Sequence, residues 1–298
     1  MMQDGADHQR GQQPARPRRV ILYGAGSARW REALDPASGV WDGVPGVSEV
    51  VFAERFSDLL RQGWGEGRRS IVLPLRRRAL QRFPRLWWNL APSRFAHDTC
   101  ADKLRFDRFI RSAGMADMVP ASWRLVAECR FPCVIKRFDK DGSFGVRVVG
   151  SMDELAATLA AKPFRRRPVL FQDLVEGLID HATHCVAVDG RIVWQTSYAY
   201  DIDPTTRVQT TADHAGRRRI VASATVLAQF ERVLAALRYS GPVSFDWRPR
   251  GEGAVLFEIN PRFGGSMMLD ISRDDLRAGL TALVQHVRPP EWLPGSRG

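Results

Sequence analysis

The residues best suited to metal chemistry lie in two short segments near the C-terminus. Asp246 ends the predicted strand 242–246, and Glu258 and Asn260 close the predicted strand 254–258, with a turn-rich segment between the two strands. Residues i and i+2 of a strand point to the same side, and pairing of the strands brings Asp246 to the other two. Two carboxylates and one amide oxygen are hard ligands that suit magnesium beside a nucleotide phosphate. A solvated hairpin with ordinary surface acids is the alternative interpretation.

Lysine is rare in this chain and therefore informative. Of 44 basic residues only Lys103, Lys136, Lys140 and Lys162 are lysine, so arginine supplies positive charge almost everywhere else. A lysine then indicates a place that requires a compact ammonium group and not a planar guanidinium. Exposed salt bridges are the alternative for these positions.

The composition predicts a globular protein that favours anionic ligands. Its 298 residues, 44% of them hydrophobic, allow one large domain or two to three small ones. The net charge of +11 is spread along the chain, and the arginine runs 76–78, 165–167 and 217–219 are expected to be solvated. This scatter argues against a dedicated nucleic-acid module, and a phosphorylated or acidic substrate is the lesser alternative.

The terminal segment and the cysteines indicate a cytoplasmic protein without a membrane span. Residues 1–17 are polar and are predicted to form a disordered tail, and no apolar run approaches the roughly 20 residues that a span needs. The four cysteines form no C-x-x-C pair, so reduced thiols are expected. His181 and His184 are three residues apart on a predicted strand, which argues against a zinc site there.

The periodicity predicts alternating strands and helices. In the first part, a buried strand at 19–23 is followed by Gly24-Ala25-Gly26, but Arg29 stands where a dinucleotide fingerprint needs glycine. The remaining predictions are strands at 47–53, 70–73, 131–136, 144–149, 169–174, 182–188 and 191–194, helices at 55–62, 98–113, 219–237 and 273–287, and an irregular polar segment at 196–214.

Taken in order, five of these pieces resemble the ATP-grasp family. They are Asp102-Lys103-Leu104, the strand 132–136 with the glycine-containing loop 139–146, the segment 169–177, Asp246, and Glu258-Ile259-Asn260-Pro261-Arg262. The resemblance covers roughly residues 99–288. It implies an α/β chain with the α+β ATP-grasp fold: a small N-terminal Rossmann-like αβ domain at 18–98, then a two-lobed ATP-grasp module at 99–298. About 118–177 would be the small nucleotide-covering lobe, and about 178–288 the metal- and substrate-binding lobe.

The resemblance also implies roles for individual residues. Lys103 and Lys136 would bind phosphates, and Asp180 would hold the ribose, with Glu176 as a competitor. The loop residues Gly142, Ser143 and Gly145 would cover the phosphates, or else form an ordinary β-turn. The hinge residues Gln172, Asp173, Leu174 and Val175 would bind adenine, and Asp246, Glu258 and Asn260 would hold two Mg²⁺ ions, with Mn²⁺ as an alternative metal.

One position departs from the family pattern. Many ATP-grasp ligases have an arginine two residues before the first metal-binding aspartate, where this chain has Ser244. We therefore expect Arg262 to stabilise the oxyanion, supported by backbone N–H groups near Gly264 and Gly265. A structural salt bridge is the alternative role for Arg262.

The resemblance implies an ADP-forming carboxylate–amine ligase that works through an acyl-phosphate; a carboxylate–thiol ligase is a variant of it. The segment 196–214 would form the wall for an amino acid or small peptide, with Tyr198 lining it, Asp201 binding an amine and Arg207 a carboxylate, unless it is a surface loop. A phosphotransferase on the same scaffold and a non-catalytic nucleotide-binding protein remain as alternatives. Family analogy also allows a homodimer.

Overall fold

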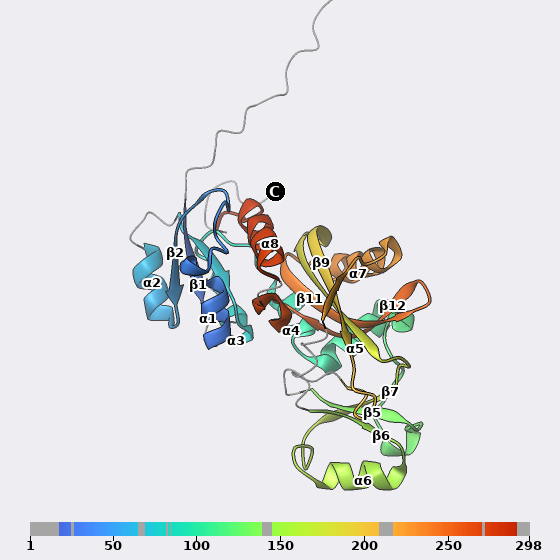
Figure 1. The fold of residues 1–298 in the computed structure, drawn as a ribbon. Coiled ribbons are helices and arrows are strands. Elements are labelled where there is room, and N and C mark those ends of the chain that lie inside the picture. The colour runs from blue at the N-terminus through green and yellow to red at the C-terminus, as the bar shows by residue number, and fades with distance from the viewer. Residues whose placement is uncertain are drawn as a thin grey trace, which may run out of the picture.

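The structure is a computed structural model, and it describes residues 18–24, 27–64, 69–81, 83, 85–138, 145–208, 217–269 and 272–290. Three sheets form within these residues. Figure 1 shows a three-stranded N-terminal sheet, a five-stranded central sheet and, at the opposite end of the molecule, a four-stranded sheet, which we call the smaller sheet because it has fewer strands than the central one. The predicted tail 1–17 and the loop residues Gly142 and Ser143 lie outside the described residues.

The N-terminal sheet is parallel and has the strand order β2-β1-β3. Its central strand is fully buried from Val20 to Leu22, because helices cover both faces of the sheet. This is the small α/β unit that the sequence predicts. Its elements are β1 (Arg18–Tyr23), α1 (Ala28–Leu34), η1 (Pro36–Ser38), β2 (Val47–Ala53), α2 (Phe56–Trp64), β3 (Ile71–Pro74) and α3 (Arg77–Gln81).

The smaller sheet is antiparallel and has the order β4-β7-β5-β6. Cys133 and Ile135 of β5 pack into a core with Leu155 of α6. Because strand side chains alternate, Val134 and Lys136 point to the opposite face. The elements of this part are η2 (Ala116–Met118), β4 (Ser122–Trp123), η3 (Val126–Glu128), β5 (Cys133–Arg137), β6 (Val146–Val149), α6 (Met152–Ala160) and β7 (Val169–Asp173).

The central sheet is also antiparallel and has the order β10-β9-β8-β11-β12. Its strands are β8 (Ile179–Val188), β9 (Arg191–Asp201), β10 (Arg218–Ile220), β11 (Gly241–Arg250) and β12 (Gly253–Asn260). The remaining elements are α4 (Arg94–Cys100), α5 (Lys103–Ser112), α7 (Ala224–Ala236), η5 (Gly265–Met268) and α8 (Arg273–Gln285).

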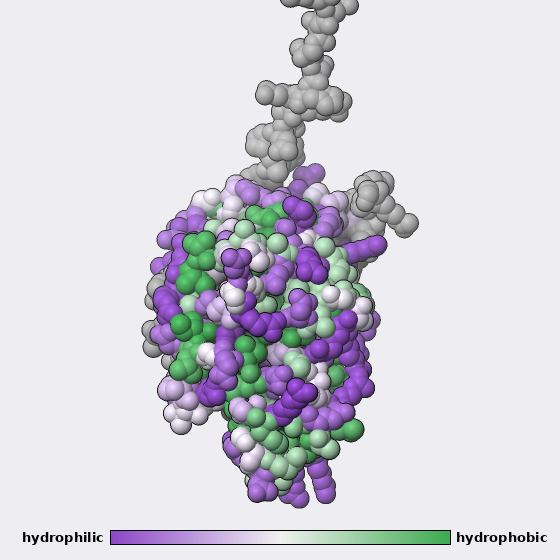
Figure 2. All heavy atoms as spheres, turned by 90° about the vertical axis from the view of Figure 1, so that its right-hand side faces the viewer, coloured by the Kyte–Doolittle hydropathy of each residue, from purple (hydrophilic) through white to green (hydrophobic). Residues whose placement is uncertain are grey.

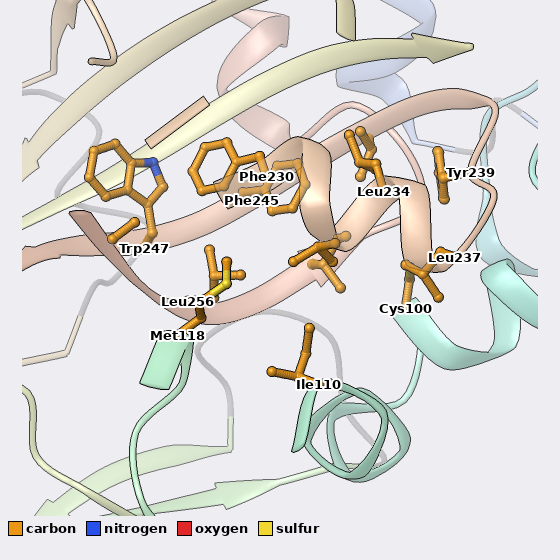
Figure 3. Packing of buried hydrophobic residues seen from close by; sticks show 14 of the residues in the cluster. Cys100, Ile110, Met118, Phe230, Leu234, Leu237, Tyr239, Phe245, Trp247 and Leu256 are labelled. Carbon is orange, nitrogen blue, oxygen red and sulfur yellow. The ribbon is translucent and has the colours of Figure 1, made fainter. Parts of the chain in front are cut away.

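Aromatic packing against α7 fixes which face of β11 is free for chemistry. Phe230 of α7 stacks on Phe245 of β11 with ring centroids 4.2 Å apart, and Trp247 meets Phe230 edge-on (Figure 3). Strand alternation then turns the side chains before, between and after these two aromatic residues of β11 to the other face of the sheet. These side chains are Ser244, Asp246 and Arg248.

The molecular surface shows a mixed face on the side turned away from the N-terminal sheet. Figure 2 shows hydrophilic residues over much of this face, with hydrophobic ones gathered in smaller areas between them. None of the described helices is long and apolar enough to cross a membrane.

Three predicted element boundaries are wrong. The single helix predicted at 98–113 is two helices, α4 and α5, because the Asp102 side chain accepts the N–H groups of Leu104 and Arg105 and so starts a new helix. The segment 196–201, predicted to be irregular, continues β9. The helix predicted from 219 begins at Ala224, where Ser223 is the N-cap, and residues 218–220 form the edge strand β10.

The ends of the hairpin also differ from the prediction. Asp246 lies inside β11, which continues to Arg250, because Arg248 is buried and is held in the strand by side-chain contacts. A β-bulge follows Asp246 in the pairing with β12: Asp246 faces Glu258, and the next residue of β11 pairs with Leu256. The bulge leaves Phe257 unpaired, so that both Phe257 and Glu258 reach the free face.

Candidate active site

One cleft of about 260 Å³ lies between the smaller sheet and the free face of the central sheet. It collects most of the residues that the sequence singles out, although they come from segments far apart in the chain. The predicted residues that line it are Lys103, Lys136, Asp173, Leu174, Val175, Asp180, Arg207, Asp246, Glu258, Asn260, Arg262, Gly264 and Gly265.

The three candidate metal ligands lie together. Asp246 and Glu258 are direct cross-strand neighbours, and Asn260 donates from Nδ2 to Asp246 Oδ2 at 3.3 Å. Burial, with the Glu258 and Asp180 carboxylates, raises the pKa of Asp246 well above its ordinary value. Among the described residues no cluster of three or more His, Cys, Asp or Glu occurs, so the set rests on two carboxylates and one amide. These hard oxygens fit a divalent cation, which would also stabilise the ionised form of the buried Asp246 carboxylate.

Two lysines border this acidic group from different elements. Lys103, the first residue of α5, places Nζ 3.1 Å from Glu258 Oε1. Lys136, on β5, is buried with Nζ 5.0 Å from the centre of the Phe257 ring. Burial lowers the pKa of Lys136 to about 8, although the Glu258 carboxylate opposes the shift. Buried ammonium groups facing a cleft are poised to gain from an anion that enters it.

Asp180 is held by an arginine from β11. Arg248 donates from Nε to Asp180 Oδ1 at 2.7 Å, and its Nη1 donates to the carbonyl of Val175. The left-handed φ of Gly177 brings the backbone against Arg248, because a Cβ there would lie 3.1 Å from Arg248 Cδ. Arg248 therefore joins the hinge 173–175 to the candidate ribose ligand. Glu176, the competitor, is exposed and lies outside the cleft lining.

Gln172 and Gly145 lie beside the cleft and do not line it. The Gln172 side chain is buried, its Oε1 has no hydrogen-bond partner among the described residues, and it faces a small cavity that Lys103 and Lys136 also border. Gly145 packs against Arg137, whose Cβ would lie 2.8 Å from an added Cβ. Gly142 and Ser143 of the same loop are outside the described residues.

A buried histidine holds the loop after Arg262. Nδ1 of His184 accepts the N–H of Gly264 at 3.2 Å, so Nε2 carries the proton and donates to Ser266 Oγ at 2.7 Å. Burial, with the Arg217 and Arg262 charges, lowers the pKa of His184 to about 3, so the ring is neutral. The prediction that the Gly264 N–H supports the oxyanion needs a correction, because this N–H already donates to His184 Nδ1.

Ser244 lies beside this loop, and Arg262 lines the cleft together with Arg207 and Arg248. Ser244 is buried and borders the cleft, and its Oγ would lie 3.3 Å from a Cβ added at Gly264. Arg262 lines the cleft and donates from Nη1 to the carbonyl of Phe263 at 3.1 Å. The salt bridge considered for Arg262 from the sequence does not occur among the ion pairs of the described residues.

The predicted substrate wall is brought together only in part. Arg207 lines the cleft but pairs with Glu176 at 2.7 Å. Asp201 is exposed outside the lining and pairs with Arg218 at 2.8 Å. Tyr198 is fully buried below the cleft, where its hydroxyl donates to a carboxylate of α8, and its neighbour Tyr200 is the tyrosine that borders the cleft.

Sequence reasoning missed three residues around the cleft. Arg248 was assigned to the turn, although it follows Asp246 by two residues and a longer strand places it on the same face. His184 was weighed only as a zinc ligand. Arg217 was placed in a solvated run, but its side chain is buried. No signal in the sequence distinguishes Arg217 from Arg218 and Arg219 before the register of β10 is known.

Comparison with known proteins identifies the fold. No model of a protein family matches the sequence, and no curated protein does. Solved structures match over most of the chain. D-alanine–D-alanine ligase from Bacillus anthracis is 16% identical with a TM-score of 0.62, over 89% of this chain and 93% of the ligase.

Two further structures give the same result. L-amino acid ligase from Bacillus licheniformis is 14% identical with a TM-score of 0.57, covering 92% of this chain and 78% of its own. N5-carboxyaminoimidazole ribonucleotide synthetase from Thermus thermophilus is 17% identical with a TM-score of 0.59, and the match covers 89% of this chain and 78% of the synthetase. The chain has the ATP-grasp fold, as the resemblance in its sequence predicted.

Proposed function

We propose that this protein is an ATP-dependent ligase that activates a carboxylate as an acyl-phosphate and joins it to an amine, releasing ADP and phosphate. One observation carries the proposal: a single cleft collects two buried lysines, two opposed carboxylates with Asn260, and Arg262. The structural relatives support the reaction class, and the D-alanine–D-alanine ligase of this fold has been solved with ATP. The substrates we propose are an acid and an amine of amino-acid or small-peptide size.

We further propose how the chain divides this work. Residues 18–98 would form the domain that precedes the ATP-grasp module, and 99–298 would form the module itself. Within it, about 118–177 would cover the nucleotide, and about 178–288 would carry the metal and substrate residues. The position of the cleft between the smaller sheet and the central sheet supports this division.

The charges of the cleft suit a nucleoside triphosphate. The hinge 173–175 would bind the base through its backbone, and Asp180, oriented by Arg248, would accept the ribose hydroxyls. Lys103 and Lys136 would bind phosphate oxygens as point charges. Asp246, Glu258 and Asn260 would hold two magnesium ions, which would supply neutralisation of the triphosphate charge.

The bond changes follow from this placement. An oxygen of the substrate carboxylate attacks the γ-phosphorus of ATP, the bond from that phosphorus to the ADP oxygen breaks, and ADP leaves. The amine then attacks the acyl carbon, the bond from this carbon to the phosphate oxygen breaks, and the nitrogen loses a proton as phosphate leaves. Arg262, with the loop that His184 fixes, would stabilise the negative oxygen of the tetrahedral intermediate.

The test follows the nucleotide product while panels of acids and amines are supplied. We expect ADP and phosphate, and E258Q should lower turnover on the order of 100-fold or more because several kcal/mol of charge stabilisation are lost. E252Q, on the exposed turn of the same hairpin, is the matched control and should retain wild-type turnover. AMP as the product, or full activity in E258Q, would refute the proposal. Trapping with hydroxylamine distinguishes the ligase from a phosphotransferase, because only an acyl-phosphate yields a hydroxamate.

A further inference from the structure

Arg217 is a buried guanidinium whose hydrogen-bonding groups are only partly used. Its side chain lies with Cζ 4.5 Å from the centre of the Tyr198 ring, and Nη1 donates to the carbonyl of Ser266. Only 7% of the residue is exposed, and Nε and Nη2 have no hydrogen-bond partner among the described residues. A buried charge left in this state destabilises the protein unless an anion completes it.

The neighbouring arginines each have a carboxylate, which sets Arg217 apart. Arg218 pairs with Asp201 at 2.8 Å, and Arg219 pairs with Asp275, also at 2.8 Å. Within the described part of the chain, no carboxylate forms an ion pair with Arg217. Arg207, the clamp that the sequence suggested for a substrate carboxylate, is itself occupied by Glu176 at 2.7 Å.

The two unused donors lie on one edge of the guanidinium. Nε–H and the Nη2–H beside it point in the same direction and form the fork that a carboxylate accepts with both oxygens. The opposite nitrogen, Nη1, is the one that binds Ser266. The partner that this edge of Arg217 lacks is therefore a planar carboxylate, which would accept from Nε and Nη2 while the guanidinium stays on the Tyr198 ring.

The register of the sheet places this fork on the same face as the cleft. Arg218 pairs with Ala199 of β9, so Arg217, one residue earlier, stands beside Tyr200, which lines the cleft. From β10 to β11, which carries Asp246, there are three strand spacings, or about 14 Å between backbones. Side chains extend into this interval from both strands, and an extended dipeptide spans at most about 7 Å. Arg217 is not itself among the residues that line the cleft, but it binds the carbonyl of Ser266, which is, and the spacing of the two strands matches a molecule of amino-acid to dipeptide size.

We propose that Arg217 binds a substrate carboxylate that is not consumed in the reaction. This inference rests on the proposed ligase function and narrows its substrates to molecules that keep a free carboxylate. The carboxylate can belong to the amine substrate, as the α-carboxylate of an amino acid or the terminus of a short peptide. It can also be the second carboxylate of a dicarboxylic acid that is activated at its other end.

The kinetic test uses matched probes in wild-type protein, R217M, R217K and R218M. Amino acids and dipeptides are compared with their carboxamides as amine substrates, and dicarboxylic acids with their monoamides as acid substrates. R217M should raise the KM of the carboxylate form of one substrate about tenfold or more and leave the KM of its amide, the kcat and the KM of ATP within about twofold. R217K should give a KM for the carboxylate form between those of wild type and R217M. R218M, which removes a surface ion pair, should have the wild-type KM. An equal effect on carboxylate and amide forms in both series would overturn the proposal.

A binding test decides the role of Arg217 even if no acid and amine support turnover. Thermal unfolding is recorded in sodium acetate and in sodium chloride of equal ionic strength. Acetate should raise the Tm of wild type and R218M above the chloride value, and R217M should lose at least about half of that rise. R217M in chloride should unfold cooperatively at the wild-type Tm or above it, because it removes an unpaired buried charge. No acetate effect on wild type, or an equal rise in R217M, would refute the site, whereas absent ADP formation alone would refute the ligase function.

Discussion

Replacing Lys136 with methionine should make the protein more stable and less able to bind nucleotide. The ammonium group is buried on the cleft side of β5, and burial lowers its pKa from 10.5 to about 8. Each pKa unit corresponds to about 1.4 kcal/mol, so keeping this lysine charged in the folded state destabilises the protein by about 3 kcal/mol. Methionine fills a similar volume beside the Phe257 ring without a charge.

The pH dependence of this penalty has a definite sign. Between about pH 8 and 10.5 the unfolded chain binds the lysine proton more fully than the folded protein does, so stability rises with pH through this window. Below pH 8 the whole penalty is present. K136M should therefore exceed wild type by about 3 kcal/mol at pH 7, and the difference should vanish as the pH approaches about 10.5.

Urea unfolding at pH 7 and pH 10, with and without ATP and magnesium, measures both effects. Nucleotide should stabilise wild type much more than K136M, because the phosphate oxygens pair with the ammonium group. K162M, at an exposed position after α6, is the matched control and should change neither quantity. If K136M is less stable than wild type at pH 7, or gains equally from ATP, then Lys136 does not have the role assigned to it.

Three further predictions follow from contacts around the cleft. R248M should destabilise the protein by about 3 to 5 kcal/mol in urea unfolding, because it removes the guanidinium that pairs with the buried Asp180 carboxylate, and adding D180N should recover most of that loss. G264A should lower kcat about tenfold or more with little change in the KM of ATP, because its Cβ would lie 2.8 Å from His184 Cε1; G150A, whose Cβ would meet Glu154 Oε2 at 3.5 Å, an ordinary contact, should keep the wild-type kcat. F230A should lower the free energy of unfolding by about 3 to 5 kcal/mol, since it removes a ring stacked at 4.2 Å; a loss below about 1 kcal/mol would contradict the packing.

The sequence predicted the fold and the grouping of Asp246, Glu258 and Asn260 in the cleft, because both follow from the order of neighbouring elements. Asp246 and Glu258 stand on consecutive strands joined by a short turn, so their pairing follows from neighbouring residues alone. The lysines were found by composition, since the chain uses so few. Both signals can be taken from the sequence without knowing which distant strands pair.

The contacts that the sequence could not give are those made between distant strands. His184 and Ser266 are 82 residues apart, and the tautomer of the ring follows only from its contact with Gly264. Arg217 could be distinguished from the neighbouring arginines only once the register of β10 against β9 was known. A polar segment such as 196–201 also becomes a buried strand when the sheet on either side of it requires one.

The origin of the phosphate oxygens tests the central claim most directly. An acid that supports ADP formation is labelled with ¹⁸O at both oxygens of its carboxylate, and the phosphate released with its amine partner is analysed by mass spectrometry. Attack of the carboxylate on the γ-phosphorus predicts one ¹⁸O in every phosphate formed. Phosphate without the label would show that the carboxylate never joined the phosphorus, and the acyl-phosphate route would be wrong.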